Sequence, residues 1–236
     1  MFGNKKNKVL GNVLKLFKII SPKDLVLYNP NTIRNVIKLS LSSFYNDNIF
    51  NYVELNYGSK RYKNLTTFLD KLNNTLSNIE IVDLRISDSK DTNLILYSNE
   101  LQNQIQKDDL GIVELSICSE SNNINKDTAK IFVDKLIEIF PIDYGYIFPL
   151  RKNMDINTEK NIKKSLFSSS ISVTKEDIVR RKMLFNINDG FLPQLYQINF
   201  LNQPQFDALN NSNTSVKEIV DIKNKLKMVV VDNVSG

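Results

Sequence analysis

Histidine is absent from the 236 residues, and this absence removes more chemistry than any motif in the chain adds. Without it there is no usual general base at neutral pH, no Ser-His or Cys-His nucleophilic pair, and no imidazole ligand for zinc or iron. The single cysteine, Cys118, cannot build a thiolate metal site, and the seven glycines are too scattered for a phosphate-binding loop. The sequence therefore predicts no catalytic residue, no metal site and no cofactor.

The chemistry that remains would use carboxylates, lysine, tyrosine or a serine–lysine pair. Residues 87–90 and 172–175 have the Ser-x-x-Lys spacing of penicillin-recognising serine enzymes, but the companion motifs are missing. Acidic pairs at 88/91 and 108/109 fall in predicted loops, where a solvated carboxylate is far more common than a cation ligand. Cys118 ends an apolar strand and is expected to be a buried small hydrophobe. A histidine-independent enzyme that uses carboxylates or lysine stays an alternative without a located site.

The elements that would position any site are clearest between residues 111 and 150. An apolar run (111–118), a segment of helical period (126–140) and an aromatic run (143–150) predict a strand, a helix and a strand. Taken from residue 51, the expected order is strand, helix, strand, short strand, strand, helix, strand. This order predicts an α+β fold with a ferredoxin-like split βαβ antiparallel sheet at about 51–150 and its helices on one face.

The first 23 residues carry the excess of positive charge. They contain six lysines and no acidic residue, whereas the rest of the chain holds 25 basic and 26 acidic residues. Within them, residues 5–20 predict an amphipathic helix, which would pack on the domain or bind an anionic surface. We therefore expect a basic N-terminal helix or leader (1–23) before a single α+β domain (24–236), with a further helix near 33–44 and a helical C-terminal third.

Two kinds of partner are disfavoured by the composition. No window approaches the 18 or so uncharged apolar residues of a membrane span. RNA-binding modules of ferredoxin-like shape need a basic residue before a Gly-aromatic step, and Asp143 occupies that position before Tyr144, Gly145 and Tyr146. A near-neutral body also weakens attraction to phosphate. An RNA-binding ferredoxin-like module remains only an alternative hypothesis.

One segment resembles a known group of proteins. Residues 189–202 (DGFLPQLYQINFLN) form a turn, a short aromatic piece and an Asn-Phe-Leu step, and they follow the aromatic Asp143-Tyr-Gly-Tyr146 strand. This arrangement resembles the C-terminal region of bacterial polymorphic-toxin immunity proteins of the type VI secretion kind. The resemblance implies a small cytoplasmic α+β protein that binds and blocks a toxin delivered by a neighbouring cell.

The sequence therefore favours a non-enzymatic protein-binding module, because nine tyrosines supply a residue type common in binding hot spots. The predicted binding residues are Tyr144, Tyr146, Tyr196, Asn199 and Phe200, and the predicted partner is another protein, such as a cognate toxin. A structural component of a secretion or envelope assembly stays open as an alternative, and so does the oligomeric state.

Overall fold

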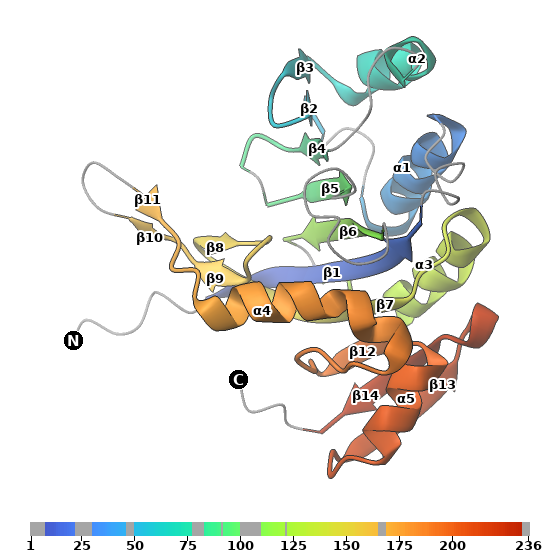
Figure 1. Cartoon of the computed structure of the whole chain (residues 1–236). Helices are drawn as coiled ribbons and strands as arrows, with labels where there is room; N and C mark the ends of the chain where they lie inside the picture. Colours follow the sequence, from blue (N-terminus) through green and yellow to red (C-terminus); the bar gives the residue numbers. More distant parts are fainter. Residues whose placement is uncertain are drawn as a thin grey trace.

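The computed structural model describes residues 8–21, 30–45, 50–76, 83–90, 92–99, 110–120, 122–164 and 169–232. Within them, ten strands form one sheet in the order β13-β14-β12-β7-β1-β6-β5-β4-β2-β3, and each neighbouring pair is antiparallel (Figure 1). The strands are β1 (Val9–Ile20), β2 (Tyr52–Leu55), β3 (Lys60–Tyr62), β4 (Asp83–Ser87), β5 (Leu94–Asn99), β6 (Gly111–Ser119), β7 (Tyr144–Arg151), β12 (Ile198–Leu201), β13 (Val216–Asp221) and β14 (Lys227–Val231).

The remaining elements are helices and two small hairpins. The helices are α1 (Pro30–Phe44), α2 (Leu65–Leu76), α3 (Lys126–Ile139), α4 (Lys175–Met183) and α5 (Gln203–Asn210), with 3-10 turns η3 (Leu184–Asp189) and η4 (Lys223–Lys225). The hairpins pair β8 (Met154–Asp155) with β9 (Lys160–Asn161), and β10 (Lys163–Lys164) with β11 (Ser169–Ser170). None of the described helices is long and apolar enough to cross a membrane.

Strand β1 lies at the centre of the sheet, so the helix predicted for residues 5–20 is wrong. It pairs with β6 on one side and β7 on the other, along most of its length. A strand that is buried on both faces carries apolar residues almost continuously, and a short run of that kind matches helical spacing by chance. Leu14 and Leu16 face one layer of the core and Val13 and Phe17 the other, while Lys15 is buried beside Phe17.

The strand–helix–strand unit predicted for 111–150 is present as β6, α3 and β7. Because β6 and β7 are both antiparallel to β1, they run parallel to each other with β1 between them. Helix α3 begins where the Asn125 side chain accepts from the backbone N–H groups of Asp127 and Thr128, and it buries Phe132 and Leu136. The prediction for this unit is confirmed.

The predicted fold class is nevertheless wrong. The sheet is more than a ferredoxin-like one: it continues through β5, β4, β2 and β3 on one side and through β12, β14 and β13 on the other. The C-terminal third is not mainly helical, because it supplies three of these strands. Helices also cover both faces of the sheet: α1, α2 and α3 lie on one, and α4 and α5 lie on the other (Figure 1). The pairing of distant strands, which a local pattern does not encode, decides this architecture.

Candidate functional site

Helix α4 is unusual because none of its described side chains is buried. Thr174 caps its N-terminus in a capping box with Asp177. A free helix shorter than about 12 residues is marginal in water, and most helical stability in proteins comes from packing an apolar face. The nine residues of α4 therefore lack the packing that stabilises the other long helices, which bury apolar residues against the sheet.

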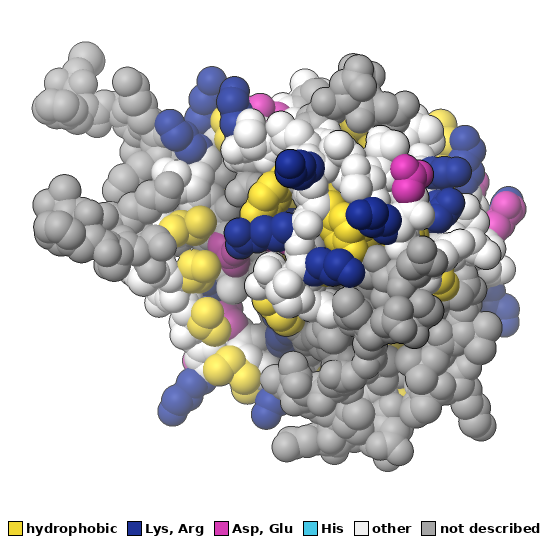
Figure 2. Space-filling model, turned by 90° about the horizontal axis from the view of Figure 1, so that it is seen from above, with side chains coloured by type: hydrophobic (Ala, Val, Ile, Leu, Met, Phe, Trp, Pro, Cys, Tyr) yellow, Lys and Arg dark blue, Asp and Glu magenta, His cyan; other side chains and the backbone are white. Residues whose placement is uncertain are grey.

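The segment around α4 also exposes much apolar surface. Of the nine large hydrophobic side chains that are exposed in the described residues, five lie between 171 and 183. They are Ile171 (36% exposed), Val173 (53%), Ile178 (51%), Val179 (54%) and Met183 (38%). Figure 2 shows a row of hydrophobic side chains on the left, the side where Figure 1 places the hairpins that precede α4. Exposed apolar side chains that gather in one place mark interaction sites more often than scattered ones do.

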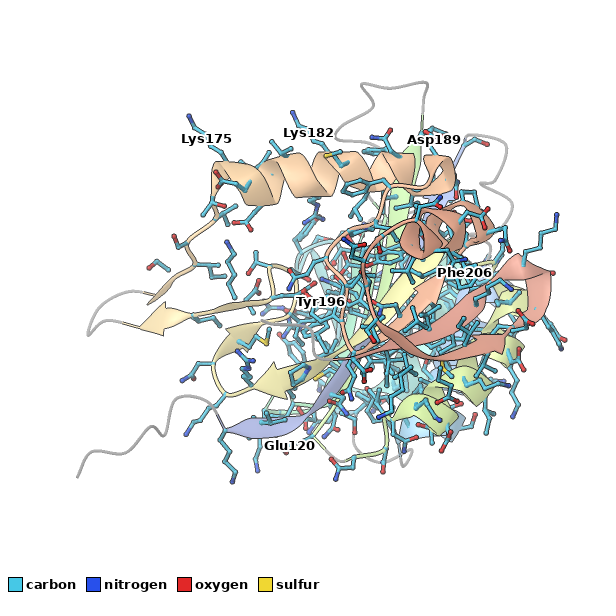
Figure 3. All side chains as sticks on the ribbon, turned by 90° about the horizontal axis from the view of Figure 1, so that it is seen from below. Glu120, Lys175, Lys182, Asp189, Tyr196 and Phe206 are labelled. Carbon is cyan, nitrogen blue, oxygen red and sulfur yellow. The ribbon has the colours of Figure 1, made fainter. Side chains whose placement is uncertain are left out.

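Residues 151–183, named the arm from here on, concentrate positive charge. The arm holds nine basic and four acidic residues, so its net charge equals the +5 of the whole chain. Its exposed charged side chains, among those described, are Arg151, Lys152, Lys175, Arg181 and Lys182 against the single acid Glu176. Lys175 and Lys182 point away from the sheet (Figure 3). Residues 24–236 are nearly neutral in total, as expected from the sequence. Within them the basic arm is balanced by an excess of acidic residues in the rest of that range.

A buried ionic cluster fixes the arm to the sheet. The Lys15 side chain is only 2% exposed, and its Nζ lies 3.2 Å from Glu114 Oε1 and 3.2 Å from Glu159 Oε1. The same ammonium donates to the backbone carbonyls of Ile156 at 3.0 Å and Asn157 at 3.1 Å, both in the turn between β8 and β9. Lys15 therefore joins the central strand to the start of the arm.

Glu159 is the arm's half of this cluster. Its Oε1 accepts from Lys15 and from the Tyr146 hydroxyl, and its Oε2 accepts from the Tyr196 hydroxyl. Glu159 adopts a left-handed backbone with φ of 59°, which costs free energy for a residue other than glycine. Because strain of this kind persists only where the surroundings enforce it, the three contacts hold the turn in place. Burial, and then the neighbouring Glu159 charge, raise the pKa of Tyr146 well above its usual value.

A second tie joins the arm's hairpin to α4. Lys160 forms an ion pair with Asp177, the residue that also completes the helix cap. The hydrogen bond from Lys160, followed by those from Thr174, lowers the pKa of Asp177 far below that of an ordinary carboxyl. Lys15 therefore binds Glu159, and the next residue in the chain, Lys160, binds Asp177 of α4. These two contacts connect the central strand to α4.

A cavity of about 130 Å³ lies between α4 and the sheet. Its walls include Phe17 and Ile112 from the sheet, Val173, Ile178 and Leu184 from the α4 side, and Tyr196. Lys15, Glu114 and Glu159 also line it. A wider depression of about 640 Å³ adjoins it and shares Glu159, Asp177 and Tyr196. The site is a mainly apolar opening with buried charges along it.

The structure places the five predicted binding residues together only in part. Tyr146 and Tyr196 stack with ring centroids 4.4 Å apart, and both line the cavity. Asn199 is fully buried, and its side-chain oxygen accepts from the Tyr196 backbone N–H at 2.9 Å. Tyr144 is buried on the same face of the sheet, whereas Phe200 belongs to the core on the opposite face. Their part in binding stays a prediction, although Tyr144, Tyr146, Asn199 and Phe200 are all buried in the structure.

Sequence reasoning missed the ionic cluster. The amphipathic helix expected at 5–20 would place its lysines, Lys15 among them, on the solvated side, away from Glu114 and Glu159. A usable signal was present, because Lys15 and Glu114 each interrupt a run that is otherwise apolar enough to be buried. A charged residue at such a position needs a partner, and the two partners here lie 99 and 144 residues away in the chain.

The other candidates for chemistry are engaged in structural roles. Cys118 is fully buried, as predicted, and burial raises the pKa of its thiol to about 12. Burial alone would raise the pKa of Asp88, but hydrogen bonds from Asn93, Lys90 and Thr92 hold it below its ordinary value. The described residues contain no group of three or more Cys, Asp and Glu side chains suited to a metal ion. Asp91, Asp108 and Asp109 lie outside the described residues.

Comparisons with known proteins bear on the fold of this chain. No protein-family model matches the sequence, and neither does any curated protein. Among solved structures, the Pseudomonas aeruginosa T6SS protein PA0821 is similar, with a TM-score of 0.55 at 10% sequence identity. The match covers 95% of this chain and 70% of that chain. At this identity the similarity concerns the fold alone, and it extends over almost all of the chain.

Proposed function

We propose that this chain is a protein-binding module that works in type VI secretion, and that its arm binds and neutralises a toxin. The observation that carries the proposal is α4, a nine-residue helix with no buried described side chain and with Ile178 and Val179 half exposed. A partner that covered these side chains would supply the packing that the helix lacks. The fold shared with a T6SS protein and the resemblance of residues 189–202 to immunity proteins support the setting.

The charge of the arm indicates the chemistry of the partner. Five exposed basic side chains and one exposed acid surround the apolar row, so the complementary surface is acidic with an apolar centre. A surface that binds nucleic acid is basic, because it must attract phosphate. The nucleic-acid site of a nuclease toxin would therefore repel the arm, and a toxin with another activity fits better.

The size of the arm suits a specific interface. A standard protein–protein interface uses about 20–30 residues on each side. The arm spans residues 151–183, and its described part exposes both the apolar centre and the charged rim that such interfaces combine. Tyr146 and Tyr196 lie beneath it as support, in keeping with their stacked position in the cavity wall.

A pair of matched substitutions tests the binding surface. Ile178 in α4 is 51% exposed and Ile131 in α3 is 54% exposed, on opposite faces of the sheet. Each is changed to Glu, and each variant is used with the wild type to capture proteins from the native host. We expect one stoichiometric acidic partner that Ile131→Glu retains and Ile178→Glu loses. An anchor residue in an interface is worth about 2 kcal/mol or more, so affinity should fall at least about thirtyfold.

The toxin part of the proposal has its own test. The captured partner is expressed in a heterologous host, alone and together with the wild type or with Ile178→Glu. Growth arrest that the wild type relieves and Ile178→Glu does not would support neutralisation. A partner that both variants capture equally would contradict the α4 surface, and a harmless partner would contradict the toxin assignment while leaving the binding role in place.

A further inference from the structure

The cavity between α4 and the sheet has the size and lining of a pocket for one large side chain. Its volume is about 130 Å³, and cavities of this order hold a benzene-sized ring. Aromatic and aliphatic side chains form its walls, as in pockets that take an interface anchor. Ile178 belongs both to this wall and to the exposed row on α4, so the cavity opens at the proposed binding surface.

Two of the charged groups that line the cavity, Lys15 and Glu159, are saturated with hydrogen bonds. The Lys15 ammonium has three hydrogen-bond donors, and it uses them on Ile156, Asn157 and Glu159. Glu159 accepts from Lys15, Tyr146 and Tyr196. These two residues therefore have little capacity left for a ligand, and they are better suited to holding the shape of the pocket.

Glu114 differs from Lys15 and Glu159 in this respect. Its Oε1 accepts from the Ser116 hydroxyl at 2.9 Å and lies 3.2 Å from Lys15 Nζ. Both of its polar contacts within the described residues use Oε1, although an ionised carboxylate accepts on two oxygens. The Glu114 side chain lines the cavity with 11% of its surface exposed. Oε2 is thus available to accept a hydrogen bond from a donor that enters the pocket.

We infer that the pocket takes an aromatic side chain with a donor at its tip, a tyrosine or a tryptophan, presented by the acidic surface of the partner. The ring would pack against Phe17, Ile112 and Ile178, and the O–H or N–H would donate to Glu114 Oε2. Tyrosine and tryptophan combine a large apolar body with one donor, and they are enriched among interface hot spots. This inference rests on the proposed function, because it supplies the anchor of that same interface.

Small probes test the pocket without the partner. We would titrate p-cresol, indole and 4-methylanisole into the full-length protein and follow the methyl NMR signals of Ile112 and Ile178. The first two probes carry a donor and the third does not, although p-cresol and 4-methylanisole have similar rings. We expect p-cresol and indole to shift both signals, and p-cresol to bind about tenfold more tightly than 4-methylanisole, the effect of a hydrogen bond to a charged acceptor.

Two variants locate the interaction. Glu114→Gln keeps the size of the side chain but removes its charge, so p-cresol affinity should fall several-fold while 4-methylanisole affinity stays unchanged. Ile112→Phe fills the cavity and should abolish binding of all three probes, with folding checked by circular dichroism. Should Ile112→Phe fail to fold, the Glu114→Gln comparison still decides the matter.

The outcomes are distinct from those of the capture experiment. The inference is overturned if no probe binds at its solubility limit, or if p-cresol and 4-methylanisole bind equally to the wild type and to Glu114→Gln. Probe binding without any α4-dependent partner would overturn the proposed function and leave the pocket. An α4-dependent partner without probe binding would do the reverse.

Discussion

Replacing Lys15 with Met is expected to release the arm from the sheet. Methionine keeps a flexible apolar chain of similar length but removes the ammonium that contacts Glu114, Glu159 and the two carbonyls of the β8–β9 turn. Both carboxylates are largely buried, with side chains 11% and 7% exposed. Removing one partner of a buried ion pair costs about 3–5 kcal/mol, because the remaining charge stays unpaired.

The two carboxylates left by Lys15→Met differ in how much they lower the free energy of global unfolding. Glu159 lies in a turn whose strands are only two residues long, so it can reach water if the turn opens. Glu114 lies in β6, within the sheet, and cannot move out in the same way. We therefore expect a loss of about 3 kcal/mol in urea unfolding, near the lower limit for a buried pair, together with much faster amide exchange at 154–161.

Lys18→Met is the matched control for this change. Lys18 lies on the same strand and pairs with Asp143 at 3.0 Å, but its side chain is 18% exposed. Both side chains of this pair, 18% and 15% exposed, are more accessible to water than those of the Lys15 cluster, so Lys18→Met should cost less than Lys15→Met and leave exchange in the arm unchanged. Adding Glu159→Gln to Lys15→Met should recover part of the loss, since it removes a stranded charge. Equal stability of the two lysine variants, or unchanged exchange at 154–161 in Lys15→Met, would refute the reasoning.

Three further outcomes follow from single sites. Gly145→Ala should destabilise the protein by about 1–3 kcal/mol in urea unfolding, because the added Cβ would lie 2.5 Å from a methyl of Leu16; an unchanged midpoint would contradict the packing. The thiol of Cys118, whose pKa burial raises to about 12, should resist iodoacetamide at pH 8 in the folded protein and react only at the rate of unfolding, as mass spectrometry would show. The pKa of Asp177 is lowered in the folded protein, so its pairing with Lys160 stabilises α4 fully at pH values above the ordinary carboxyl pKa. This stabilisation is lost as the pH falls through the lower pKa of the folded state. Amide exchange in α4, corrected for the intrinsic exchange rate, should therefore increase in acid.

Local signals in the sequence predicted individual elements well and their assembly poorly. The spacing of apolar residues identified β6, α3 and β7, because the pattern of a strand or a helix is largely determined within a few residues. The same spacing led to a helix at 5–20, since a strand buried on both faces has no alternation to reveal it. The partners of β1 lie about 100 residues or more along the chain, and no local pattern encodes such pairings.

The candidate site shows the same division. Tyr146 and Tyr196 were predicted as separate binding residues from the resemblance to immunity proteins, and the structure brings their rings into contact, while their part in binding stays a prediction. Lys15, Glu114 and Glu159 become a cluster only once β1, β6 and the β8–β9 turn are placed side by side. The apolar runs around Lys15 and Glu114 indicate that these two charges are buried, but they do not show which residues pair with them, and Glu159 alone resembles a solvated surface charge.

A polar cluster suits this position better than an apolar one, although apolar packing is often the more stabilising choice. The β8–β9 hairpin has two-residue strands, and the apolar side chains that it packs against the core are Met154 and Ile156. Apolar contacts alone are non-directional and would leave its position poorly defined. Lys15 instead binds two specific carbonyls and one carboxylate of the turn, so its contacts are met in only one placement of the arm. A binding surface that presents Ile178 to a partner needs a fixed position on the sheet. For such a surface, precise positioning of the arm matters more than additional stability.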